Sequence, residues 1–109
     1  MKDEELETIQ QSRNLTHPRV TLDQVNANIA GENYFTLEQA CAGQPTFPAF
    51  ATFTVCVLTL KNGFVVLGES APASPENFDP EIGRKIAKQK AVDKVWPLMG
   101  YALRETLSA

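Results

Sequence analysis

Two runs of β-forming residues on either side of an Asn-Gly pair constrain this fold more than any other sequence feature. Residues 52–60 and 64–69 are rich in Thr, Val and Phe, and the Asn-Gly pair stands at 62–63. Such a pair tolerates the positive backbone angles of a type I′ turn, whose twist suits a two-residue hairpin loop. We therefore predict an antiparallel hairpin in which Leu58 lies opposite Leu67.

Both faces of this hairpin are apolar. One face carries Cys56, Leu58, Leu60, Val65 and Leu67, and the other carries Phe53, Val55, Val57, Phe64 and Val66. A two-stranded sheet is barely stable in water, and apolar residues on both faces indicate burial on both sides. The pattern therefore favours either a homo-oligomer or a sheet that is extended by the N-terminal half of the chain.

Helices are expected on both sides of the hairpin. Residues 21–24 and 36–39 have the Thr-x-x-Gln capping-box signature, with Gly31 and Gly43 as helix stops. A longer helix is predicted over about 80–96, with Asp79 as its N-cap, Pro80 at its first position and Pro97 as a break or kink. The apolar sector expected on this helix contains Ile82, Ile86, Val92, Val95, Trp96 and Met99. The predicted fold class is α+β, with the hairpin packed by this helix and by short N-terminal helices.

Length and composition limit the class of protein. A chain of 109 residues is the size of one domain, and a net charge of −3 gives no general attraction to nucleic acid. The longest apolar stretch is far shorter than the roughly 20 residues that cross a bilayer. The acidic N-terminus does not resemble a secretory signal. We expect a cytoplasmic protein that binds neither membranes nor nucleic acid non-specifically.

The N-terminal segment differs from the remainder of the chain. Residues 1–19 are polar and lack sustained periodicity, so we expect a flexible polar arm or a weakly packed short helix. A single α+β domain is expected over 20–109. Residues 1–50 hold seven acidic and three basic residues, whereas the segment from Arg84 to Arg104 holds six basic residues and one acid. This basic segment is the expected anion-facing surface.

The sequence offers no convincing catalytic or metal site. Asp79 and Glu81 are explained by capping and by the dipole of the predicted helix. The one histidine, His17, precedes a proline in the polar arm, and Cys41 and Cys56 lack metal-site spacing and are expected to be thiols. We therefore expect a protein that is not an enzyme and that uses no metal or cofactor.

The basic residues near the start of the predicted helix are the candidate binding residues. Arg84, Lys85 and Lys88 can contact an anion, although lysine stems that simply cover apolar surface are the more ordinary interpretation. Polar groups of the preceding loop and two aromatic rings able to stack a base complete the candidate site: Ser70, Ser74, Asn77, Trp96 and Tyr101. The segment lacks the glycine spacing of known phosphate-binding loops.

Residues 53–64, 68–70 and 74–79 together resemble a family of small phage proteins, the Gp-forty-nine-like family of enterobacterial podoviruses. The resemblance continues through 81–87, 94–98 and 100–101, and it also touches 20–34. This chain departs from the family at 71–73, where the family often has a cysteine, and at Met99, where the family often has an acid. These departures argue against essential chemistry at either position. It implies phage origin and action inside the infected cell, and no known activity.

Two functions remain open. The first is counter-defence, in which an oligomer sequesters a cyclic or adenine nucleotide signal at a subunit boundary lined by Arg84, Lys85 and Lys88. The second is inhibition of a host defence or nucleic-acid-processing protein through the acidic N-terminal half. Both predict a non-catalytic protein of the host cytoplasm.

Overall fold

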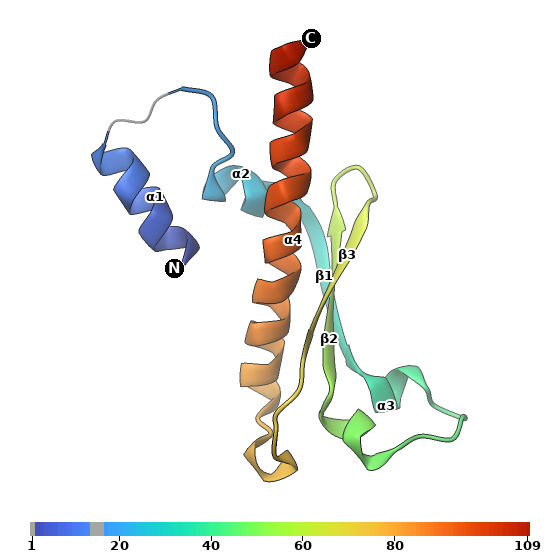
Figure 1. Ribbon diagram of the computed structural model, residues 1–109. Helices are drawn as coiled ribbons and strands as arrows, with labels where there is room; N and C mark the ends of the chain where they lie inside the picture. The colour runs from blue at the N-terminus through green and yellow to red at the C-terminus, as the bar shows by residue number, and fades with distance from the viewer. Residues whose placement is uncertain (1, 14–16) are drawn as a thin grey trace.

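A three-stranded antiparallel sheet lies against one long helix in the computed structural model, which describes residues 2–13 and 17–109 (Figure 1). The strands stand in the order β1-β2-β3. The α+β fold class is confirmed. The main elements are β1 (Ile29–Thr36), β2 (Thr54–Leu60), β3 (Val65–Ser70) and α4 (Pro80–Ser108).

The strand β1 is the element that the sequence analysis missed. The preceding helix α2 spans Leu22–Ala27 and begins with the predicted Thr21 capping box, but it ends before Gly31, the expected stop. Ile29 opens the strand instead. β1 contains Gly, Glu and Asn, which are uncommon in strands, so its pairing with β2 prevails over local propensity. The hairpin is thus part of a sheet extended by the N-terminal half, one of the two expected alternatives.

The hairpin is confirmed, but its turn and register differ from the prediction. The loop has three residues, Lys61 to Gly63, and only Gly63 has a positive φ, of 90°. The Leu60 amide donates to the Phe64 carbonyl at 2.8 Å, as in a type I turn closed by a glycine bulge. The pairing is therefore shifted by one residue, and Leu58 lies opposite Val66.

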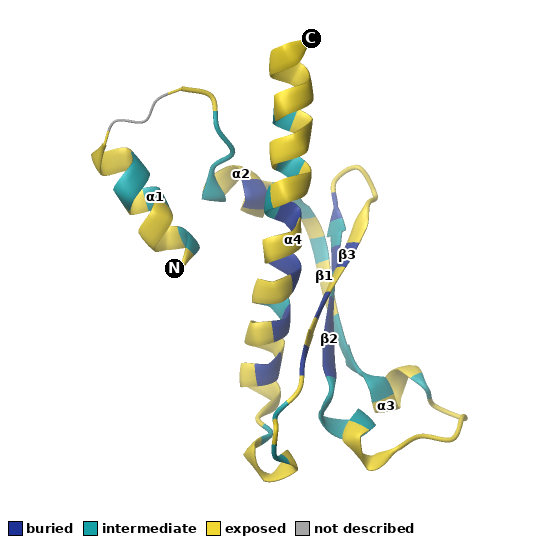
Figure 2. Ribbon diagram, in the orientation of Figure 1, coloured by how far each residue is buried: buried dark blue, intermediate teal, exposed yellow. Residues whose placement is uncertain are grey.

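This shift decides which hairpin residues enter the core. Leu58 and Val66 face α4 and are buried, whereas Val65 and Leu67 lie on the far face and are exposed. The segment between β1 and β2 contains α3 (Leu37–Ala40) and a 3-10 turn (Pro48–Thr52), which contact each other and β1. Figure 2 shows that burial concentrates where β2 and α4 meet.

The face of α4 that packs on the sheet consists of small residues. Gly83, Ala87, Ala91 and Val95 are buried together with Val92, whereas Ile82 and Ile86 are exposed. The predicted apolar sector was therefore wrong at its N-terminal end. The physical reason lies in β3, because Gly68 approaches the backbone of α4 so closely that a side chain there would overlap the Ala87 carbonyl oxygen.

α4 is one continuous helix of 29 residues that contains Pro97, so of the two expected alternatives the longer helix that continues past Pro97 is the one observed. Helix α1 (Asp3–Ser12) forms from part of the predicted arm and has no buried residue. It contacts α4 through a 3.1 Å hydrogen bond from Trp96 Nε1 to Asp3 Oδ2. Residues 1 and 14–16 of that predicted arm lie outside the described residues. None of the helices described in residues 2–13 and 17–109 could span a membrane.

Candidate anion-binding site

Two hollows flank the first turn of α4. We name them the Arg84 pocket and the Ser70 pocket. The Arg84 pocket has a volume of about 320 Å³ and is lined by Tyr34, Phe35, Thr36, Gln39, Thr54, Phe78, Pro80 and Arg84. The Ser70 pocket has a volume of about 90 Å³ and is lined by Thr52, Ser70, Ala71, Pro72, Asn77, Phe78, Asp79, Ile82, Gly83 and Ile86.

The Arg84 pocket combines a cation with uncharged hydrogen-bond donors. Arg84 forms no salt bridge with any described residue, and no acidic side chain lines the pocket. Thr36 and Gln39 form the capping box of α3, in which the Gln39 side-chain oxygen accepts from the Thr36 amide at 2.9 Å. The Gln39 side-chain NH2 group and the Thr36 hydroxyl proton remain able to donate. An anion in this pocket would therefore meet one fixed charge and two neutral donors.

Aromatic rings supply the apolar part of the same pocket. Tyr34 lines it from β1, and Phe78 lines it from the loop before α4. A purine or pyrimidine base can stack on such rings, whereas its phosphate needs a cation. The volume of about 320 Å³ is at the lower end of the range of small-molecule sites.

A hydrogen-bonded cluster beside the pocket holds Lys88. Its ammonium lies 3.1 Å from Glu32 Oε2, which also accepts a 2.9 Å hydrogen bond from the Tyr34 hydroxyl. The Tyr34 hydrogen bond, and then Lys88, lower the pKa of Glu32. Burial, followed by the bond to Glu32, raises the pKa of Tyr34 above its ordinary value of 10.0. The charge of Lys88 is thus already paired with a carboxylate, unlike that of Arg84.

Cys56 lies in the core beneath this cluster. Burial raises the pKa of its thiol. A buried thiol with a raised pKa is a poor nucleophile. Both cysteines are free, as the sequence analysis expected.

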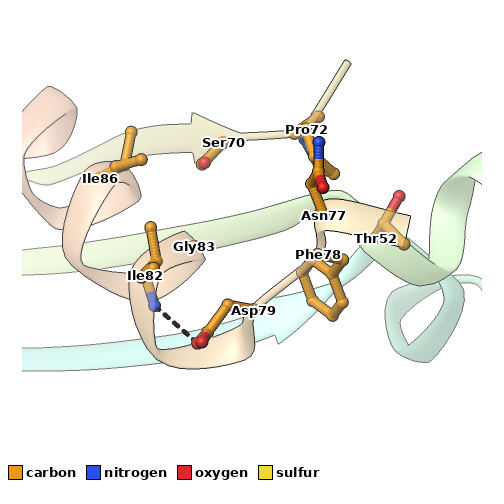
Figure 3. Close-up of a pocket in the computed structure, with 10 residues that line it drawn as sticks. Thr52, Ser70, Pro72, Asn77, Phe78, Asp79, Ile82, Gly83 and Ile86 are labelled. Carbon is orange, nitrogen blue, oxygen red and sulfur yellow. Dashed lines mark hydrogen bonds between the residues drawn. The ribbon is translucent and has the colours of Figure 1, made fainter. Parts of the chain in front are cut away.

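The Ser70 pocket is less suited to an anion. Asp79 lines this pocket, and Figure 3 shows its carboxylate joined to the amide of Ile82, at a distance of 3.2 Å. Asp79 is the predicted N-cap of α4 and also accepts from Glu81. A carboxylate repels an anion, and a volume of about 90 Å³ is well below the roughly 300 Å³ of ordinary ligand sites.

The structure separates the residues that were predicted to form one site. Arg84 lines one pocket, with Lys88 nearby in the cluster, while Ser70 and Asn77 line the other pocket. Lys85 is exposed and lies 3.4 Å from Glu81. The remaining predicted residues lie elsewhere: Ser74 bonds Glu76, Trp96 contacts α1, and Tyr101 is exposed near the end of α4.

Tyr34, Thr36 and Gln39 are among the pocket residues that the sequence analysis did not propose. They belong to β1 and α3, and β1 has no alternating pattern strong enough to be recognised. The capping-box signature at Thr36 did place a helix start there, but not its proximity to Arg84. Among the described residues, no group of His, Cys, Asp and Glu side chains could hold a metal ion.

A family model described as the phage protein (N4 Gp49/phage Sf6 gene 66) family matches residues 20–107 of the chain. The match includes all strands, α2, α3 and nearly all of α4. No curated protein and no solved structure matches the chain.

Proposed function

Because the chain belongs to the phage protein family of N4 Gp49 and phage Sf6 gene 66, we propose that it acts in the infected host cell by binding rather than by catalysis. The ligand is an anionic nucleotide, held by Arg84 in the Arg84 pocket. Sequestration of such a molecule removes a signal from the host without any chemical step. This is the counter-defence role expected from the basic segment.

One observation carries this proposal. Arg84 is a cation without a carboxylate partner in the described chain, in a pocket that also offers neutral donors and aromatic rings. A guanidinium can bind a phosphate with two parallel hydrogen bonds, which are stronger than bonds between neutral groups. Lys88 adds positive potential nearby, although Glu32 offsets part of it.

Calorimetric titration of the purified protein with a panel of cyclic and adenine nucleotides tests the proposal. We expect saturable binding of at least one nucleotide. Arg84→Gln should weaken that binding about tenfold or more, because a charge-assisted hydrogen bond contributes about 1.5–3 kcal/mol.

The matched control is Lys85→Gln, which removes the same charge from the next residue of α4. Lys85 does not line the Arg84 pocket, so its variant should bind within about twofold of the wild type at moderate salt. Absence of binding across the panel refutes the nucleotide proposal. Equal losses in the two variants would mean general charge attraction instead of a site.

A second function is supported by the surface of α1. This helix begins with Asp3, Glu4 and Glu5 and has no buried residue, so it presents negative charge to solvent. We propose as the alternative that this surface covers a basic surface of a host protein. Glu4→Lys combined with Glu5→Lys should abolish co-purification of a stoichiometric host polypeptide, while Arg84→Gln should leave it unchanged.

A further inference from the structure

The outer edge of β3 carries backbone groups without partners in the described chain. The Leu60 amide donates to the Phe64 carbonyl, so the carbonyl of Phe64 and the backbone groups of every second residue after it face β2. The amides and carbonyls of Val65, Leu67 and Glu69 therefore point away from the sheet. β3 is the last strand of the sheet on this side.

The two edges of the sheet differ in how well they are protected against pairing with another strand. β1 has an irregular register between Ile29 and Gly31 and carries Glu32, which is paired with Lys88. Bulges and charges of this kind discourage pairing with other strands. β3 has an even register with β2, contains no proline or lysine, and has Glu69 as its one charged residue. Its edge is open to another strand.

Exposed apolar side chains flank this open edge on both sides. Val65 and Leu67, on the face away from α4, are 49% and 44% exposed. On α4, Ile82 and Ile86 are 56% and 43% exposed and lie one helical turn apart. An apolar surface on both sides of an unpaired strand is typical of an interface rather than of a solvated edge.

The total surface also favours a second copy as the occupant. The chain exposes 7700 Å², whereas a folded monomer of this mass exposes about 6,000 Å². Its radius of gyration is 17.0 Å, against about 13 Å for a compact domain of this length. Part of this excess belongs to α1 and to the last turns of α4, which are not part of the β3 edge. A standard interface buries about 800 Å² on each partner, and the exposed apolar residues on β3 and at the start of α4 are the surface that a second copy can cover.

We propose that two copies of this chain pair through β3, antiparallel, about a two-fold axis at Leu67. Leu67 then lies opposite Leu67 of the second copy, and Val65 lies opposite Glu69. Each of these three residues exchanges hydrogen bonds with its counterpart, and the two sheets become one. Ile82 and Ile86 of both α4 helices meet above the joined edge. The Arg84 pocket is on the β1 side and stays open, so this pairing does not depend on the proposed ligand.

Sedimentation velocity tests the pairing. The wild type should sediment at twice the 12.0 kDa chain mass at micromolar concentration. Leu67→Lys and Ile86→Lys should each sediment as a monomer with unchanged circular dichroism, because both side chains are exposed in the single chain. Phe47→Lys replaces a still more exposed apolar residue, which lies in the segment between β1 and β2, and should remain a dimer. A monomeric wild type, or dimers of unchanged mass in both lysine variants, would overturn the proposal.

Cysteine cross-linking tests the register and keeps the proposal falsifiable if a lysine variant unfolds. In the Cys41→Ser background, Leu67→Cys should form a disulfide-linked dimer on mild oxidation, because directly opposed residues lie about 5.5 Å apart between Cα atoms. Val65→Cys should not, since its two copies would be more than about 13 Å apart. Cross-linking of Val65→Cys without Leu67→Cys would contradict this axis.

Discussion

Gly68 is the residue on which the contact between the sheet and α4 depends most directly. An added side chain would overlap the Ala87 carbonyl oxygen and the Ala91 amide, both of which are backbone atoms that cannot rotate away. We expect Gly68→Ala to lower the free energy of unfolding by about 3 kcal/mol, through forced separation of β3 and α4. Urea denaturation measures this change.

Gly100→Ala is the matched control for that substitution. Gly100 lies inside α4, is exposed, and has no atom near the position of an added Cβ. The same methyl group should therefore raise the unfolding free energy by about 0.5–1 kcal/mol, because alanine favours the helix. If both variants were destabilised alike, the close approach at Gly68 would not be the cause.

Tyr34 makes the stability of the protein depend on alkaline pH. Its pKa is raised in the folded chain, mainly by burial, so unfolded chains lose this proton first. The unfolding free energy should consequently fall as the pH rises above 10.0, and it should fall less steeply in Tyr34→Phe. Urea denaturation of both proteins on either side of that pH provides the comparison.

A direct titration isolates the same group. The chain has two tyrosines, so Tyr34 is the remaining one in Tyr101→Phe. Tyrosinate absorbance in this variant should appear well above pH 10.0 or together with unfolding. When Glu32→Gln is added to this variant, the pKa of Tyr34 should stay raised, although by less, because burial is the largest cause of the shift and the bond to Glu32 the second. Ionisation of Tyr34 near its ordinary pKa would contradict this hydrogen-bonded cluster.

Among the elements, those with local signals were predicted and those that depend on distant pairing were not. The capping boxes at Thr21 and Thr36 and the N-cap at Asp79 are written in adjacent residues, and all three are present. β1 has no such signal. Its eight residues are stabilised by β2, which is distant in sequence, and the Arg84 pocket could not be assembled without β1.

The hairpin shows how a correct element can have the wrong register. The Asn-Gly pair correctly marks the turn, but one added loop residue moves every β3 side chain to the opposite face. Val65 and Leu67 are exposed for this reason. The predicted register placed Val65 and Leu67 on the same face as Leu58. It therefore did not predict exposed apolar residues beside the open edge of β3.

Helix α1 is the element whose removal should cost least. It has no buried residue, and its contacts with the remainder of the chain include Asp3 to Trp96 and Glu7 to Arg19. Deletion of residues 1–12 should change the free energy of unfolding, measured by circular dichroism, by no more than about 1 kcal/mol. The fluorescence of Trp96, the one tryptophan, should shift to longer wavelength as it meets water. Loss of the cooperative transition would show instead that α1 belongs to the core.

At the scale of the whole molecule, α4 is longer than the sheet that supports it. Its 29 residues span about 43 Å, whereas the eight residues of β1 span about 27 Å. The buried residues of α4 end at Val95, and Tyr101 is 71% exposed. The last third of the helix therefore projects beyond the sheet, as Figure 1 shows at the C-terminal end.

Hydrogen exchange should divide α4 at this point. Amides of residues 83–95 should exchange only with global unfolding, because their helix face is buried against β2 and β3. Amides of residues 101–108 should exchange much faster through local fraying, since the sheet does not cover this part of the helix. Equal protection along the helix would mean that another surface covers its C-terminal third in solution.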